Sequence, residues 1–107
     1  MNLLFKRTIF GSDRDTVKDL IADMMDCINA WNDLKEDEEF EFRLILNELI
    51  ANGITHGNER CQHKALIASI REVSRDTISI CIQDEGDGFN HNACIHREYS
   101  LYTESGR

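Results

Sequence analysis

Hydrophobic and polar residues alternate along Asn2–Phe10, and this pattern predicts a half-buried β-strand that ends at Gly11. Beyond it, hydrophobic residues recur every three or four positions, as they do in a helix with one packed face. These residues are Val17, Leu20, Ile21, Met24, Met25, Ile28 and Trp31. Ser12, with Asp15 three residues later, has the pattern of a capping box. The sequence therefore predicts that Ser12 caps a helix with one buried side.

A second helix is predicted over residues 40–58, ending at a left-handed exit at Gly57-Asn58. The acidic connection at residues 32–39 precedes it, and carboxylates there favour a helix N-terminus. Residues 65–73 and Thr77–Asp84 then have the composition and alternation of two strands joined by a tight turn. Together these elements predict an α+β protein.

The composition bounds what such a chain can be. At 107 residues, it has room for one domain with a modest core. Hydrophobic residues make up 41% and charged residues 30%, which is an ordinary mixture for a soluble globular protein. The net charge of −8 argues against a nucleic-acid backbone or an anionic membrane as partner and would suit a basic partner surface.

The four cysteines form no C-x-x-C pair, and the chain has no signal peptide or long apolar run. This predicts free thiols in a reducing cytoplasm. Five residues could supply metal ligands, but their spacing matches no standard zinc pattern, and a structural metal is not expected. They are Cys61, His63, His91, Cys94 and His96.

A polar stripe runs along the second predicted helix. Glu48, Asn52 and His56 recur every four residues, so they lie above one another on one side of an α-helix. Their neighbours Ile45 and Leu49 are apolar, and an acid, an amide and an imidazole are costly to bury there unless something polar binds them. We therefore expect a binding site on this stripe. His56 is as well placed to cap the helix as to contact a phosphate.

Asp84 follows a strand in which Ile78, Ile80 and Ile82 share one face, and the alternation places its carboxylate on that face. It is either a buried acceptor that needs a donor or a solvated turn residue. Gly86 and Gly88 follow, and glycines there let the backbone approach a ligand closely. A calcium loop is excluded because the acidic spacing fails.

The segments NELIANGITHGN and IQDEGDGF resemble the nucleotide-binding boxes of the GHKL ATPases, and most closely those of the small anti-sigma-factor serine kinases. The resemblance implies a Bergerat-type fold. This is a two-layer α/β sandwich with a mixed, mostly antiparallel sheet and helices on one face. It also implies a general base at Glu48, a magnesium ligand at Asn52 and recognition of adenine by Asp84. Further ATP-binding residues are implied at His56, Gly86, Gly88 and Gly106.

The function implied is that of an ATP- and magnesium-dependent serine/threonine kinase acting on an anti-anti-sigma protein and regulating a sigma factor. The alternatives are a histidine-kinase catalytic domain and a partner-binding module without phosphotransfer. A homodimer is among the assemblies that we consider. Magnesium prefers oxygen ligands, and an ionised Asp can accept from the amino group of adenine but not from the carbonyl of guanine. The resemblance also implies a lid at residues 90–105. We expect a further helix and strand of the family to be missing here, as they would be in a proteolytic fragment.

Overall fold

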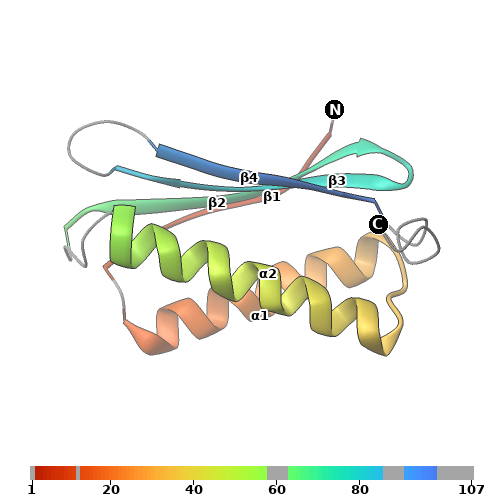
Figure 1. Ribbon diagram of the computed structural model, residues 1–107, viewed down its shortest axis with the longest axis horizontal. Helices are drawn as coiled ribbons and strands as arrows, with labels where there is room; N and C mark the ends of the chain where they lie inside the picture. The colour runs from red at the N-terminus through yellow and green to blue at the C-terminus, as the bar shows by residue number, and fades with distance from the viewer. Residues whose placement is uncertain (1, 12, 58–62, 86–90, 99–107) are drawn as a thin grey trace.

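The computed structural model describes residues 2–11, 13–57, 63–85 and 91–98, with only the backbone described at 56–57 and 91–98. Two helices lie against one face of a sheet, so the described part of the chain has two layers (Figure 1). The elements in chain order are β1 (Asn2–Phe10), α1 (Arg14–Trp31), α2 (Glu36–Asn52), the π-helical turn η1 (Gly53–Gly57), β2 (Ala65–Ser74), β3 (Thr77–Asp84) and β4 (His91–Glu98).

The sheet has the strand order β1-β2-β3-β4, and each described pair is antiparallel. This confirms the predicted α+β sandwich, although a parallel pairing, which a mixed sheet requires, does not occur between the described strands. The prediction of a lid over residues 90–105 is wrong for His91–Glu98, which pairs with β3 as β4. Hydrogen bonding to a neighbouring strand satisfies backbone groups that a lid would leave to water.

Helix α1 (Arg14–Trp31) begins one residue later than predicted. Asp13, not Ser12, is the N-cap, and its carboxylate accepts a hydrogen bond from the backbone N–H of Thr16 at 3.1 Å. An Asp at this position satisfies an otherwise unpaired amide of the first turn. The hydrophobic pattern identified the packed side correctly, and its fully buried members are Leu20, Met24, Met25 and Ile28.

Two side-chain contacts fix α1 over the first two strands. The Arg7 guanidinium of β1 forms an ion pair with Asp23 at 2.7 Å, and the Trp31 indole N–H donates to Glu72 of β2 at 3.2 Å. Both partners of the ion pair are about half exposed, so solvent screens its contribution. The contacts orient the helix along the strands, and burial of its apolar side supplies most of the stabilisation.

Helix α2 begins at Glu36 rather than at Phe40. The acidic residues taken for a connection form its first turn, where carboxylates interact favourably with the helix dipole. Glu38 accepts a hydrogen bond from the backbone N–H of Lys35 at 2.8 Å and helps to close the N-terminus. Phe42, Leu46 and Ile50 then recur every four residues and bury one side of the helix.

One hydrophobic cluster lies between the helices and the sheet. Its members come from both helices and from β1, β2 and β3. None of the helices in the described part of the chain is long and apolar enough to cross a membrane. The sheet therefore covers the buried side of α2, α1 packs along a second side, and the side of α2 that faces neither remains available for a site.

Candidate functional site

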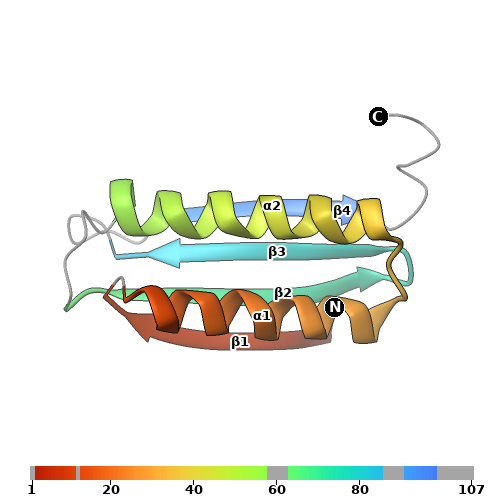
Figure 2. The ribbon, with the colours of Figure 1, turned by 90° about the horizontal axis from the view of Figure 1, so that it is seen from below.

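The C-terminal end of α2 lies over the end of the sheet where β3 finishes (Figure 2). A Cβ atom added to Gly53 would lie 2.6 Å from Leu66 Cδ1 and 3.3 Å from Ile82 Cγ2. Leu66 is the partner of Asp84 in the β2–β3 register, and Ile82 precedes Asp84 on the same side of β3. The helix end that carries Asn52 is therefore held close to the strand end that carries Asp84, as a shared site requires.

Asp84 is buried. It is the last residue of β3, only 8% exposed, and continues the row formed by Ile78, Ile80 and Ile82. Its Oδ1 atom is buried and has no hydrogen-bond partner among the described residues. Of the two interpretations that the sequence left open, this burial supports the buried acceptor and rules out the solvated turn residue. An unpaired buried acceptor is costly, so this oxygen is suited to a ligand that brings a donor.

Glu85, which the sequence reasoning did not single out, connects the segment after β3 to the start of β2. Its Oε1 atom accepts a hydrogen bond from the backbone N–H of Ala65 at 3.0 Å. This contact fixes the strand end next to Asp84 without using the Asp84 Oδ1 atom. The sequence signal was present in the D-E-G-D-G run, where a second acid directly follows the first.

Glu48 and Asn52 lie on the opposite side of α2 from the residues that face α1, and both are exposed. The sequence argument placed them on one stripe, which the helix confirms, but it also assumed that they are buried among apolar neighbours. That assumption is wrong because the buried side is formed by Phe42, Leu46 and Ile50. The two polar side chains are thus accessible to a ligand or to a partner's hydroxyl group.

The stripe does not continue to His56 as an α-helix. Residues Gly53–Gly57 form a π-helical turn, whose hydrogen bonds join residues five apart and widen the helix. His56 belongs to this turn, so its four-residue spacing from Asn52 does not place it as an α-helix would. Such π-helical turns are frequent at functional sites, and η1 packs against β3, the strand that carries Asp84. The π-helical turn η1 is therefore close to the strand end at which we expect the binding site.

The remaining predicted site residues, Gly86, Gly88 and Gly106, lie outside the described residues. Among the residues that the structure describes, no group of three metal-binding side chains occurs. The expectation of four free thiols is wrong for Cys81, which is disulfide-bonded, whereas Cys27 is free. Burial raises the pKa of the Cys27 thiol, and its Sγ lies 3.7 Å from the carbonyl oxygen of Leu4.

A cavity that the sequence reasoning missed lies between α1 and α2 and has a volume of about 590 Å³. Arg14 and Lys18 of α1 and Arg43 and Asn47 of α2 are among its lining residues, each pair being four positions apart. That spacing on two predicted helices was the available signal. Glu48, Asn52 and Asp84 do not line it, so it is separate from the stripe and the strand end.

The arrangement of Asp84, Asn52 and Glu48 combines a buried acceptor, an amide and a carboxylate around one end of the helical layer. The family model for the histidine kinase-like ATPase domain matches residues 10–107 of the chain, which include both boxes. No curated protein and no solved structure matches the chain.

Proposed function

Because the chain belongs to the family of histidine kinase-like ATPase domains and so has the ATP-binding function of the GHKL type, we propose that it is an anti-sigma regulatory factor with serine/threonine kinase activity. Its substrate in this proposal is a partner protein of the anti-anti-sigma kind, and a sigma factor is the protein it regulates. The observation that carries ATP binding is the buried Asp84 Oδ1 atom without a described partner. The kinase branch is supported by the likeness of the two sequence boxes to those kinases.

The described residues fit an adenine nucleotide. The exocyclic amino group of adenine is a donor, and the Asp84 carboxylate is an acceptor that lacks one. Guanine presents a carbonyl oxygen at the corresponding place, which would put two acceptors face to face. Asp84 therefore favours ATP over GTP in this proposal, since a mispaired buried group costs free energy.

Phosphoryl transfer asks a protein mainly for positioning and for neutralisation of charge. When bound, ATP supplies the phosphoryl group, and Mg²⁺ compensates part of the negative charge of the phosphates. Asn52 offers an amide oxygen of the kind that magnesium accepts as a ligand. Glu48, exposed on the same side of α2, is suited to accept the proton of the partner's hydroxyl group and to orient its oxygen.

Replacement of Asp84 tests the adenine assignment. Asp84→Asn can place an amide donor opposite the amino donor of adenine, so we expect ATP binding to weaken by roughly 1–3 kcal/mol. Isothermal titration calorimetry with ATP and GTP measures this effect. Asp76→Asn, which makes the same chemical change at an exposed turn position, is the control. Unchanged ATP affinity in Asp84→Asn would remove Asp84 from the site.

The kinase assignment has its own experiment. The chain is incubated with ATP labelled at the γ-phosphate, magnesium and candidate anti-anti-sigma proteins from the same host. We expect label on a serine or threonine of one of these proteins, identified by mass spectrometry. Release of labelled phosphate with no labelled protein would instead indicate an ATPase that transfers to water. ATP binding with neither result would indicate a partner-binding module.

A further inference from the structure

The cavity between α1 and α2 is mostly apolar. Its volume of about 590 Å³ lies within the roughly 300–1,000 Å³ typical of small-molecule sites. The apolar lining comes from both helices and consists of Val17, Ile21, Ala22, Ile50, Ala51 and Ile54. Ile21, Ile50 and Ile54 are buried members of the core, whereas Ala22 and Ala51 are exposed. The cavity thus has a rigid apolar floor and accessible edges.

The charged residues that line this cavity are all cationic. They are Arg14 and Lys18 from α1 and Arg43 from α2, and no acidic residue is part of the lining. This local excess of positive charge stands out in a chain whose net charge is −8. Arg14 and Lys18 make no hydrogen bond or ion pair with the residues that the structure describes. Their charges are therefore available to an anion.

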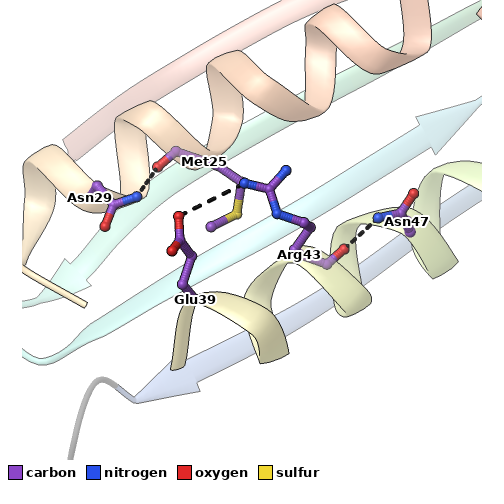
Figure 3. A network of polar contacts seen from close by, with 5 residues as sticks. All are labelled: Met25, Asn29, Glu39, Arg43 and Asn47. Atoms are coloured by element: carbon purple, nitrogen blue, oxygen red, sulfur yellow. Dashed lines mark hydrogen bonds and ion pairs between the residues drawn. The ribbon is translucent and has the colours of Figure 1, made fainter. Parts of the chain in front are cut away.

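Arg43 lines the cavity from α2, and its side chain extends in the direction of α1 in Figure 3. Its contact with Glu39 is long, at 3.8 Å, and both side chains are nearly half exposed. Such a pair contributes little and is easily exchanged for another carboxylate. The Asn47 side chain donates to the backbone carbonyl of Arg43 at 2.9 Å, so this hydrogen bond does not use the guanidinium. A guanidinium presents two parallel donors that match a carboxylate.

We propose that this cavity binds a free alkyl carboxylate, with its hydrocarbon chain on the isoleucine floor and its head group among Arg14, Lys18 and Arg43. The two helices that line the cavity pack against each other on the same sheet. A helix of another protein is about 10–12 Å across and is too wide to enter between them. A single methylene chain fits between them more closely. The site is independent of the nucleotide site, because none of its lining residues belongs to the proposed adenine or phosphoryl-transfer set.

The test uses decanoate as the probe, at concentrations where it is monomeric. Binding to the whole chain is measured by calorimetry and by amide shifts in two-dimensional NMR. We expect saturable binding with the largest shifts at Lys18, Ile21, Ala51 and Thr55. Decanol and decyltrimethylammonium have the same chain length without the negative charge, and we expect each to bind at least about tenfold more weakly. Equal binding of the three compounds, or no binding of decanoate, would overturn the proposal.

A variant locates the site without disturbing the core. Ala51→Glu adds a carboxylate and bulk to the lining at an exposed helical position, so we expect decanoate affinity to fall by on the order of tenfold or more. Ala30→Glu makes the same change at an exposed position of α1 away from the cavity and should bind decanoate as the parent does. Circular dichroism confirms that both variants are folded. Equal affinity in the two variants would place decanoate elsewhere and refute the proposal.

Charge neutralisation is a second test that leaves the cavity open. Arg14→Gln with Arg43→Gln should weaken decanoate binding and reduce its preference over decanol, while Lys6→Gln on β1 should change neither. Analytical ultracentrifugation measures whether the chain self-associates, as it would if a second copy occupied the cavity. If the parent self-associates and Ala51→Glu dissociates it, the groove is a contact between copies and the alkyl carboxylate assignment is wrong.

Discussion

Asp84 and Glu48 carry the same functional group in opposite surroundings. The Asp84 carboxylate is buried at the end of β3 with one oxygen unpartnered by described residues, whereas Glu48 is exposed on α2. A buried acceptor can discriminate between ligands because a wrong partner leaves it unpaired. An exposed carboxylate contributes little to ligand selectivity, but it is accessible to a hydroxyl group of a partner protein. The difference in burial supports the division of roles proposed above.

Glu48→Gln separates binding from phosphotransfer. The substitution keeps the shape of the side chain and removes its basicity, so we expect ATP affinity to be retained while phosphotransfer falls by a factor on the order of 10²–10⁴. Initial rates with labelled ATP and the identified partner measure the effect. Glu41→Gln, an exposed change on the same helix, is the control. Equal rates for Glu48→Gln and the parent would exclude Glu48 as the base.

The raised pKa of Cys27 leads us to expect that its contribution to the free energy of unfolding depends on pH. Burial raises the pKa of this thiol in the folded state above its unfolded value, because the interior disfavours the thiolate. The contribution is therefore complete below the unfolded pKa and is lost as the pH rises through the folded pKa. We expect the difference in unfolding free energy between the parent and Cys27→Ala to narrow above the ordinary pKa of a thiol. Urea titrations at a series of pH values measure it, and a difference independent of pH would contradict the assignment.

At the scale of elements, the junction between α2 and η1 depends on a close approach at Gly53. Its backbone is α-helical, with φ of −61°, so no left-handed conformation requires glycine there. The space does, because a Cβ atom would meet Leu66 at 2.6 Å, and Leu66 is only 1% exposed. This residue therefore sets how closely the end of α2 lies over the β2–β3 pair that carries Asp84.

Gly53→Ala distinguishes packing from helix propensity. Propensity alone predicts that alanine stabilises a helix by about 1 kcal/mol, whereas the clash predicts destabilisation by roughly 1–3 kcal/mol. We expect the second result in urea unfolding. In a Leu66→Val background, which removes the Cδ1 atom, the penalty of Gly53→Ala should shrink. A raised melting temperature for Gly53→Ala would show that the junction is not tightly packed.

At the scale of the whole molecule, a disulfide bond at Cys81 constrains the sheet covalently at strand β3. Cys81 lies opposite Cys94 in the β3–β4 register, so we expect Cys94 to be its partner. Peptide mapping without reduction should join the two peptides. Removal of a disulfide typically costs roughly 2–5 kcal/mol, and we expect Cys81→Ser to lower the melting temperature in the absence of reductant. If Cys81→Ser and the parent melt at the same temperature under those conditions, the bond does not stabilise the fold.

The sequence by itself determined the type and order of most elements, since periodicity follows from burial on one side. Asn2–Phe10 and Thr77–Asp84 were predicted with the bounds they have, and the packed side of α1 was correct. It also identified Glu48, Asn52 and Asp84 as candidates through their spacing and through the resemblance to the GHKL boxes. The sequence did not fix the first residue of α1, because Ser12 and Asp13 are both acceptable N-cap residues.

Only the tertiary structure decided which of these polar residues is buried. The alternation along β3 left Asp84 open to two interpretations, and the packing of η1 and α2 over the sheet resolved them. The same packing turned Glu48 and Asn52 outward, because Phe42, Leu46 and Ile50 occupy the buried side of the helix. Burial is a property of what packs against a residue, and that neighbour is distant in sequence. The cavity between α1 and α2 arises for the same reason, since its lining residues come from the first half of α1 and from α2 with η1, which are distant in sequence.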